Sequence, residues 1–197
     1  DLTFITNEPG HTLLDRFKVL IKDAEFFDVL VGYFYSSGFK AVYPSLENTK
    51  KIRILIGIST SKQTFDMMGK AREPVQQVLS FSHAEAKEEY GDLVVQELDN
   101  TENESDTDES IRKFIEWIRA GKLEIRAYPS QDIHSKVYII TFQESDRDTG
   151  RVITGSSNFT RAGLVDNIEF NVELKNRGDY DYAKKKLEEL WADSVDV

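Results

Sequence analysis

The 197-residue sequence contains no cysteine, and no apolar run approaches the roughly 20 residues that a membrane-spanning helix needs. The absence of thiols excludes a disulfide framework, a cysteine nucleophile and a cysteine-rich zinc site. No signal peptide is recognisable, so we expect a cytoplasmic protein with no membrane partner. Because the chain begins with Asp1 and not with Met, we also expect it to be the N-terminal part of a longer protein.

The sequence also lacks an excess of basic residues. Its net charge is −10, from 25 basic and 35 acidic residues, which argues against a broad nucleic-acid-binding face. Seven of the acidic residues form a block without a basic residue: Glu97, Asp99, Glu102, Glu104, Asp106, Asp108 and Glu109. Without this block the net charge would be −3, so a local basic groove remains compatible with the composition. We expect residues 97–109 to form a flexible acidic loop.

Runs with the two-residue period of strands alternate with runs that have the spacing of helices. The expected strands are 2–6, 25–34, 51–58, 123–128, 134–142, 151–154 and 168–174. The expected helices are 11–24, a helix that starts at 36–37, 63–91 with an interruption at Pro74, 108–120 and 179–191. This alternation predicts one α/β domain over residues 1–197, with a mixed sheet flanked by helices on both faces. No internal repeat is recognisable, so the chain offers one site motif.

His134 and Lys136 form the first segment that suggests chemistry. If the segment is a strand, residues two apart point to the same face, so these two side chains lie side by side. An imidazole attacks phosphorus or moves protons near neutral pH, and an ammonium group neutralises phosphoryl oxygens. The pair therefore suits a phosphate group.

The second segment runs from Gly155 to Asn158, where a strand is expected to end. We expect Gly155 to let the backbone approach a ligand, while Ser156 and Asn158 supply a hydroxyl and an amide. Glu169 follows Asn158 by eleven residues on another expected strand. Its carboxylate is placed to orient an imidazole.

An H-x-K motif, a later G-S-x-N motif and a glutamate eleven residues further on resemble the phospholipase D superfamily. The signature of that family is H-x-K-x4-D followed by G-S-x-N. Residues 31–34 (VGYF) and 37–39 (SGF) are similar to PLD-like domains attached to bacterial helicases and restriction-type systems. The motifs cover about the last third of the chain, and the second similarity extends more weakly over most of it.

The resemblance implies that two such motifs face one another, either from two repeats or from two identical chains. One histidine attacks phosphorus to form a phosphohistidine, the other protonates the leaving oxygen, and no metal or other cofactor is needed. The catalytic residues that carry over are His134, Lys136, Asn158, Glu169 and Ser156. The family's aspartate falls at position 141, where this sequence has Thr141.

Because the chain holds one such motif, the resemblance implies a homodimer. It also implies nucleic acid as the partner, DNA more than RNA, and a possible helicase or ATPase domain in the same full-length chain. The candidates for substrate contact are Gly155, Ser157, Tyr33 and Lys62. Residues 57–62 lack the second glycine of a phosphate-binding P-loop, so we expect no ATP site there.

The principal prediction is therefore a metal-independent endonuclease domain, and three other interpretations remain open. One is a phospholipase or transphosphatidylase. Another is a catalytically silent module for nucleic-acid binding or dimerisation. The last is a metal-dependent nuclease, because Asp166 followed by Glu173, Leu174 and Lys175 loosely matches the D…E-x-K pattern of such enzymes.

Overall fold

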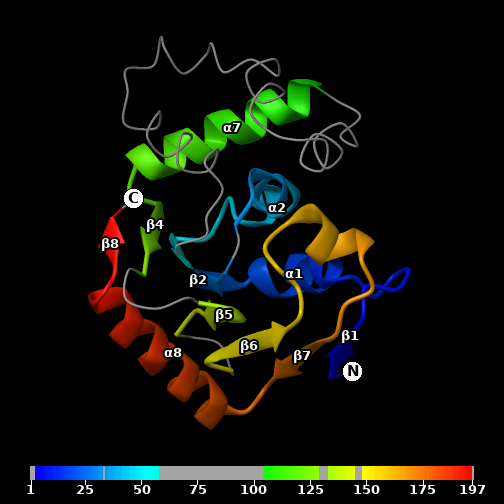
Figure 1. Ribbon diagram of the computed structural model, residues 1–197, viewed down its shortest axis with the longest axis vertical. Helices are drawn as coiled ribbons and strands as arrows, with labels where there is room; N and C mark the ends of the chain where they lie inside the picture. The colour runs from blue at the N-terminus through cyan, green and yellow to red at the C-terminus, as the bar shows by residue number, and fades with distance from the viewer. Residues whose placement is uncertain (1–2, 33, 58–103, 129–132, 145–147, 197) are drawn as a thin grey trace.

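The computed structural model describes residues 3–32, 34–57, 104–128, 133–144 and 148–196. At its centre is a mixed sheet of eight strands in the order β1-β7-β6-β5-β2-β3-β4-β8 (Figure 1). The strands are β1 (Phe4–Ile5), β2 (Ala24–Val31), β3 (Lys51–Ile56), β4 (Leu123–Ala127), β5 (Lys136–Phe142), β6 (Gly150–Gly155), β7 (Asn171–Leu174) and β8 (Val195–Asp196). β2, β3 and β4 run parallel, and the other neighbours pair antiparallel. The first and last strands thus form opposite edges of the sheet.

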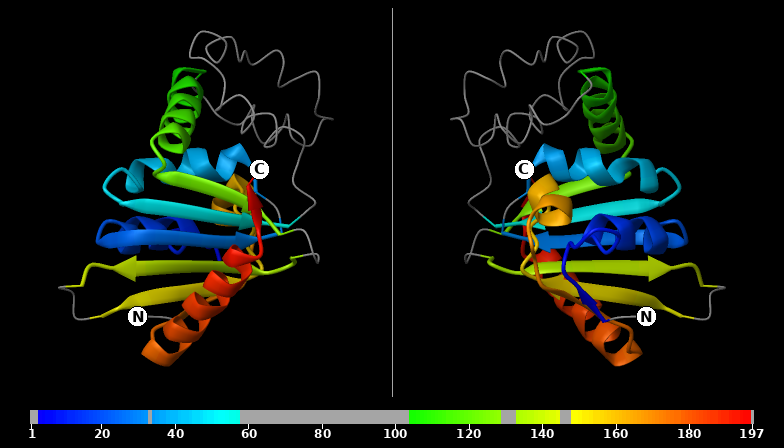
Figure 2. Two further views of the ribbon diagram at one scale, coloured as in Figure 1. Left: turned by 90° about the vertical axis from the view of Figure 1, so that its left-hand side faces the viewer. Right: turned by 90° about the vertical axis from the view of Figure 1, so that its right-hand side faces the viewer.

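Helices lie on both faces of this sheet (Figure 2), which confirms the predicted fold class. They are α1 (Leu13–Ile21), α2 (Ser36–Val42), α7 (Glu104–Arg119) and α8 (Arg177–Ala192), with a 3-10 turn η1 (Tyr43–Ser45) and a π-helical turn η2 (Ala162–Asp166). No helix in the described part of the chain is long and apolar enough to cross a membrane.

The alternation of side chains along β5 separates two apolar cores. Tyr138 and Ile140 pack with α1, α2 and α7 in the larger core, whereas Ile139 packs with α8 in the smaller one. Successive residues of a strand point to opposite faces, so this one strand anchors both layers of helices. β5, which begins at Lys136, is therefore fixed between two packed layers of helices.

The helix boundaries follow from local chemistry. The Thr12 hydroxyl accepts a hydrogen bond from the Asp15 N–H at 3.0 Å and caps α1. Asn176 caps α8 in a similar way, with its side-chain oxygen accepting from the Gly178 N–H at 2.7 Å. α7 is followed by Gly121, whose φ of 71° lies in the left-handed region that favours glycine after a helix.

Several predicted boundaries were wrong. α7 begins at Glu104, so residues 104–109 of the predicted acidic loop are helical. Residues 97–103 of that loop and the predicted helix 63–91 lie outside the described residues. Two predicted strands, 134–142 and 168–174, begin later in the structure, and both differences affect the candidate site.

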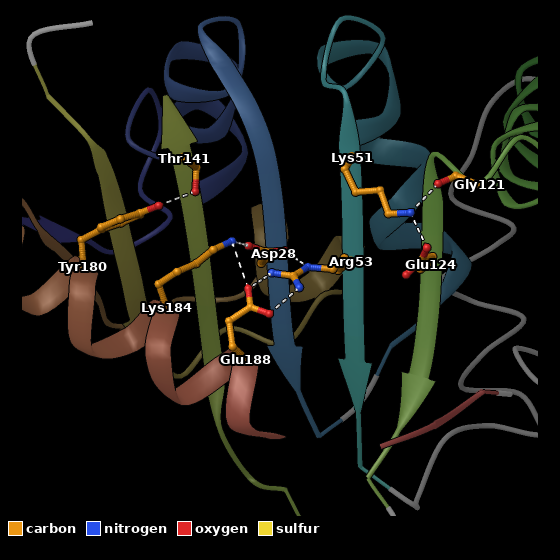
Figure 3. A network of polar contacts seen from close by, with 9 residues as sticks. All are labelled: Asp28, Lys51, Arg53, Gly121, Glu124, Thr141, Tyr180, Lys184 and Glu188. Atoms are coloured by element: carbon orange, nitrogen blue, oxygen red, sulfur yellow. Dashed lines mark hydrogen bonds and ion pairs between the residues drawn. The ribbon is translucent and has the colours of Figure 1, made fainter. Parts of the chain in front are cut away.

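α8 is attached to the sheet by a partly buried network of charges (Figure 3). Asp28 on β2 is 1% exposed, and its carboxylate binds Arg53 of β3 at 2.6 Å and also Lys184 of α8. The Arg53 guanidinium also donates two hydrogen bonds, of 2.9 and 2.6 Å, to the carboxylate of Glu188 on α8. The network therefore joins two central strands to the helix that covers them.

The charged forms in this network stabilise one another. Burial opposes the charge of Arg53, but its hydrogen bonds to Glu188 and Asp28 together with their negative charges outweigh burial and raise the pKa of Arg53. The same hydrogen bond from Arg53 lowers the pKa of Glu188. Arg53 also lies over the ring of Trp191, 5.2 Å from its centroid, so the guanidinium is enclosed by partners.

Candidate active site

Three neighbouring strands, β5, β6 and β7, place the predicted catalytic residues where their adjoining ends meet. Val137 of β5 pairs with Thr154 of β6, and Gly155 pairs with Asn171 of β7. Lys136 at the start of β5 therefore lies next to Gly155 at the end of β6. His134, Ser156, Asn158 and Glu169 lie just beyond these strand ends. The sheet register thus brings together residues that are far apart in the sequence.

His134 is exposed and lies two residues before β5, so the prediction that it belongs to the strand was wrong. The strand begins only at Lys136, which pairs with Val31 of β2. The Lys136 ammonium donates a hydrogen bond to the His134 carbonyl oxygen at 3.1 Å. This contact, and not a shared strand face, links the Lys136 side chain to the backbone of His134.

Two glycines explain the path of the segment that carries His134. A Cβ atom on Gly32, just after β2, would lie 2.6 Å from the Ile133 carbonyl oxygen. A Cβ on Gly57, just after β3, would lie 3.1 Å from the same oxygen. The Ile133 carbonyl therefore crosses the ends of two parallel strands at a distance that a side chain on Gly32 would prevent.

We expect Gly32→Ala to reduce turnover by about ten- to a hundredfold, because the added methyl group must displace the Ile133–His134 backbone. Steady-state kinetics on a phosphodiester substrate measures the effect. Gly57→Ala is the matched control and should cost less, since its Cβ would meet the same oxygen at 3.1 Å instead of 2.6 Å. A fully active Gly32→Ala chain would show that this close approach does not position His134.

Ser156 connects the end of β6 to the residues before β7. Its hydroxyl donates to the Glu169 carboxylate and accepts from the Phe170 N–H at 2.9 Å, and its own N–H donates to the Phe170 carbonyl at 3.0 Å. Glu169 precedes β7, so its predicted place on a strand was wrong. Within the described part of the chain, the hydrogen bond that the Glu169 carboxylate accepts comes from the Ser156 hydroxyl. The orientation of His134 by Glu169 therefore stays a prediction.

Gly155 and Ser157 make contacts within the protein that the sequence did not predict. A Cβ on Gly155 would lie 2.2 Å from the Phe170 carbonyl oxygen, so this glycine permits a close contact with the segment before β7. Ser157 is completely buried, and its hydroxyl accepts a hydrogen bond from Asn171 at 2.8 Å. A side chain in this position faces the interior, which does not suit the predicted contact with substrate.

Sequence reasoning missed two residues beneath this loop, Asn171 and Tyr138. Asn171 Oδ1 accepts from the Ser157 N–H at 3.2 Å, and the Tyr138 hydroxyl donates to the Ser157 carbonyl at 2.7 Å. Burial, together with the negative charge of Glu169, raises the pKa of Tyr138 well above its ordinary value, so the hydroxyl remains a donor. The sequence could have indicated Tyr138 by its position, because it follows Lys136 by two residues and lies on the same face of the strand.

α2 supports the same loop from the other side. A Cβ on Gly38 would lie 2.3 Å from the Phe159 carbonyl oxygen, and the Ser37 hydroxyl accepts from the Arg161 N–H at 3.3 Å. The rings of Phe34 and Phe159 stack with centroids 5.6 Å apart. Residues 34–38 and the residues that directly follow the G-S-x-N motif are therefore packed together.

Asn158 lies half-buried in this loop. Its backbone is covered by η2, since a Cβ on Gly163 would lie 2.4 Å from the Asn158 carbonyl oxygen. Within the described residues, its side-chain oxygen Oδ1 is buried without a hydrogen-bond partner. A buried acceptor of this kind is costly unless a donor reaches it. Asn158 therefore retains an unused acceptor at the candidate site.

Thr141 stands at the position of the family's aspartate. It lies on β5, where its hydroxyl and the hydroxyl of Tyr180 on α8 form a hydrogen bond of 2.7 Å (Figure 3). This bond joins the sheet to α8. The threonine that replaces the family's aspartate thus makes a structural contact on the face of the sheet opposite Tyr138.

The residues of the metal-dependent alternative are paired with cations. Glu173 is 2% exposed and binds Arg16 through hydrogen bonds of 2.6 and 2.8 Å. Arg151 forms a further ion pair with Glu173 at 3.2 Å, and Asp166 pairs with Arg161 at 3.5 Å. Across the described ranges, no three His, Asp or Glu side chains gather as metal ligands would. The two remaining candidates for substrate contact, Tyr33 and Lys62, lie outside the described residues.

The chain matches one family model and is similar in fold to proteins of known structure. A family model described as cardiolipin synthase, PLD-like domain, matches residues 20–191. The fold is similar to that of Nuc from Salmonella typhimurium, a phospholipase D family member, with 18% identity and a TM-score of 0.52 over 98% of this chain and 95% of that chain. For phosphatidylserine synthase from Haemophilus influenzae, the identity is 15% and the TM-score 0.53, over 98% of this chain and 39% of that chain. For the archaeal chromatin protein TrmBL2, the identity is 14% and the TM-score 0.49, over 98% of this chain and 53% of that chain. A comparison with curated protein sequences finds no match.

Proposed function

Because the chain belongs to the phospholipase D superfamily, we propose that it is a metal-independent phosphodiesterase that cuts nucleic acid, DNA in preference to RNA. The observation that supports this most is the sheet register. It gathers an imidazole, an ammonium group, a hydroxyl, an amide and a carboxylate at the adjoining ends of β5, β6 and β7. These groups suit attack on phosphorus and neutralisation of the phosphoryl oxygens.

In the proposed reaction, a nitrogen of the His134 imidazole forms a bond to phosphorus while the bond to the leaving oxygen breaks. A second imidazole gives that oxygen a proton. The same second imidazole then takes a proton from water, the water oxygen attacks phosphorus, and the bond to His134 breaks. Lys136 compensates the negative charge that develops on the phosphoryl oxygens.

The charge of Lys136 is available for this role. In the part of the chain that the structure describes, no carboxylate lies within ion-pair distance of its ammonium group, whose hydrogen bond goes to the His134 carbonyl. The Glu169 carboxylate accepts a hydrogen bond from Ser156 instead. Its negative charge therefore lies beside the loop and does not neutralise Lys136. This separation supports a phosphate-binding role for Lys136.

Metal independence is the first test of the proposal. We expect the chain to nick plasmid DNA in an excess of EDTA, because His134 and Lys136 supply the nucleophile and the positive charge that metal ions supply in other nucleases. Agarose-gel assays with and without the chelator measure it. If EDTA abolishes cleavage and Mg²⁺ restores it, a metal-dependent mechanism would replace this one. Hydrolysis of phosphatidylglycerol vesicles without any DNA cleavage would favour the phospholipase alternative.

The second imidazole must come from another molecule if the chain offers one motif, so we propose a homodimer with its active site at the interface. Exposed apolar side chains support this arrangement. Ile168 and Phe170, on either side of Glu169, are 82% and 65% exposed, and the Phe170 ring lies 6.2 Å from that of Phe4, which is 59% exposed. Apolar surface of this kind beside a site is typical of an interface between subunits.

Sedimentation should therefore report about twice the monomer mass at micromolar concentration. Phe170→Asp should shift the chain to monomers and reduce cleavage, because it places a charge in the apolar surface. Tyr182→Asp is the matched control: Tyr182 is an exposed aromatic residue of α8, and its substitution should leave both properties unchanged. A chain that is monomeric and fully active would defeat the two-imidazole mechanism.

A further inference from the structure

Tyr138 and Asn171 enclose Ser157 from two different strands. The Tyr138 hydroxyl donates to the Ser157 carbonyl oxygen at 2.7 Å. Asn171 donates through Nδ2 to the Ser157 hydroxyl at 2.8 Å and accepts the Ser157 N–H through Oδ1 at 3.2 Å. All three residues are 0% exposed. The N–H, the carbonyl and the hydroxyl of Ser157 are therefore all held by buried side chains.

These two side chains continue the segments that carry the proposed chemistry. Tyr138 follows Lys136 by two residues along β5, and Asn171 follows Glu169 by two residues. Ser157 lies between the two loop residues that face the site, Ser156 and Asn158. The hydrogen bonds therefore link the Lys136 strand and the Glu169 segment through one buried residue of the loop between them.

Filling the core does not explain why these positions are polar. Tyr138 packs against the rings of Phe17 and Phe159, at centroid distances of 5.1 and 6.1 Å, so an apolar residue would fit the surroundings. Burying polar groups costs free energy unless every group finds a partner. Here each partner belongs to the loop, and the result is a loop of fixed conformation.

We propose that Tyr138 and Asn171 are positioning residues, which hold Ser156 and Asn158 at the distance from Lys136 and Glu169 that phosphodiester cleavage requires. This inference rests on the proposed function. Neither residue touches the substrate, so both act through Ser157. Their loss should lower the rate of the chemical step more than it weakens binding.

The test compares two tyrosines that each lose one buried hydroxyl. Tyr138→Phe removes the 2.7 Å bond to the loop, and Tyr180→Phe removes the 2.7 Å bond to Thr141 on the opposite face of the sheet. With bis(4-nitrophenyl) phosphate as substrate, Tyr138→Phe should lower kcat by roughly ten- to a hundredfold with little change in KM, since small misplacements of catalytic groups cost that much. Tyr180→Phe should change kcat less than twofold, and Asn171→Ala should resemble Tyr138→Phe.

Amide hydrogen exchange provides a readout that needs no turnover. The Ser157 and Phe170 amides should exchange at least tenfold faster in Tyr138→Phe than in Tyr180→Phe, because their loop has lost its anchor. Unchanged exchange, or faster exchange with an unchanged kcat, would overturn the positioning role. A wild-type chain that hydrolyses no phosphodiester would instead defeat the proposed function, and the exchange rates alone would then decide whether the two side chains hold the loop.

Discussion

Turnover of the His134→Ala chain should fall by at least roughly a thousandfold, because removal of a nucleophile leaves only the binding contributions of the site. The chain should remain folded. His134 is exposed, and within the described residues its hydrogen bond is accepted by its carbonyl oxygen and does not involve its ring. Gel assays of plasmid cleavage measure activity, and circular dichroism measures the fold.

His11→Ala is the matched control for this substitution. His11 is also exposed, and it lies in the turn before α1, where its N–H binds the Glu8 carbonyl at 2.8 Å. Its loss should leave cleavage unchanged. Equal cleavage by wild type and a pure His134→Ala preparation would remove the proposed nucleophile.

The largest expected effect on stability comes from Arg53→Ala. This substitution should lower the free energy of unfolding by about 3 kcal/mol, because it leaves the Asp28 carboxylate, 1% exposed, with Lys184 as its remaining partner. The loss of packing against Trp191 acts in the same direction. Denaturant unfolding followed by tryptophan fluorescence measures the change.

The double substitution Arg53→Met with Asp28→Leu separates the two contributions. It removes both buried charges and keeps much of their volume, so it should recover a large part of the stability that Arg53→Ala loses. If Arg53→Ala unfolds at the same denaturant concentration as wild type, the network does not hold α8 on the sheet.

Sequence spacing was sufficient to propose a candidate site because the chemistry of each motif is local. The identities of His134, Lys136, Asn158 and Glu169 follow from short patterns, and the alternation of strands and helices was sufficient for the fold class. The register that brings the motifs together depends on the strand order β7-β6-β5, which those patterns do not contain.

Several errors of sequence reasoning share one physical origin, since they concern contacts between distant residues. His134 leaves the strand because Gly32 admits the Ile133 carbonyl, a contact over about a hundred positions of the chain. Glu173 matched a metal-ligand pattern, yet Arg16, 157 positions away, binds both of its oxygens. Ser157 points inward because Asn171 and Tyr138 meet it there, and nothing in the G-S-S-N motif specifies that direction.

Detection of a covalent intermediate tests the central claim most directly. Uniformly ³²P-labelled single-stranded DNA is mixed with excess protein, and the reaction is quenched within milliseconds to seconds in alkaline detergent, in which a phosphohistidine survives. The account predicts a labelled protein band that rises and decays with turnover, forms in EDTA and is absent from His134→Ala. Rapid cleavage by wild type without any labelled protein at any time, or an equal band from His134→Ala, would contradict it.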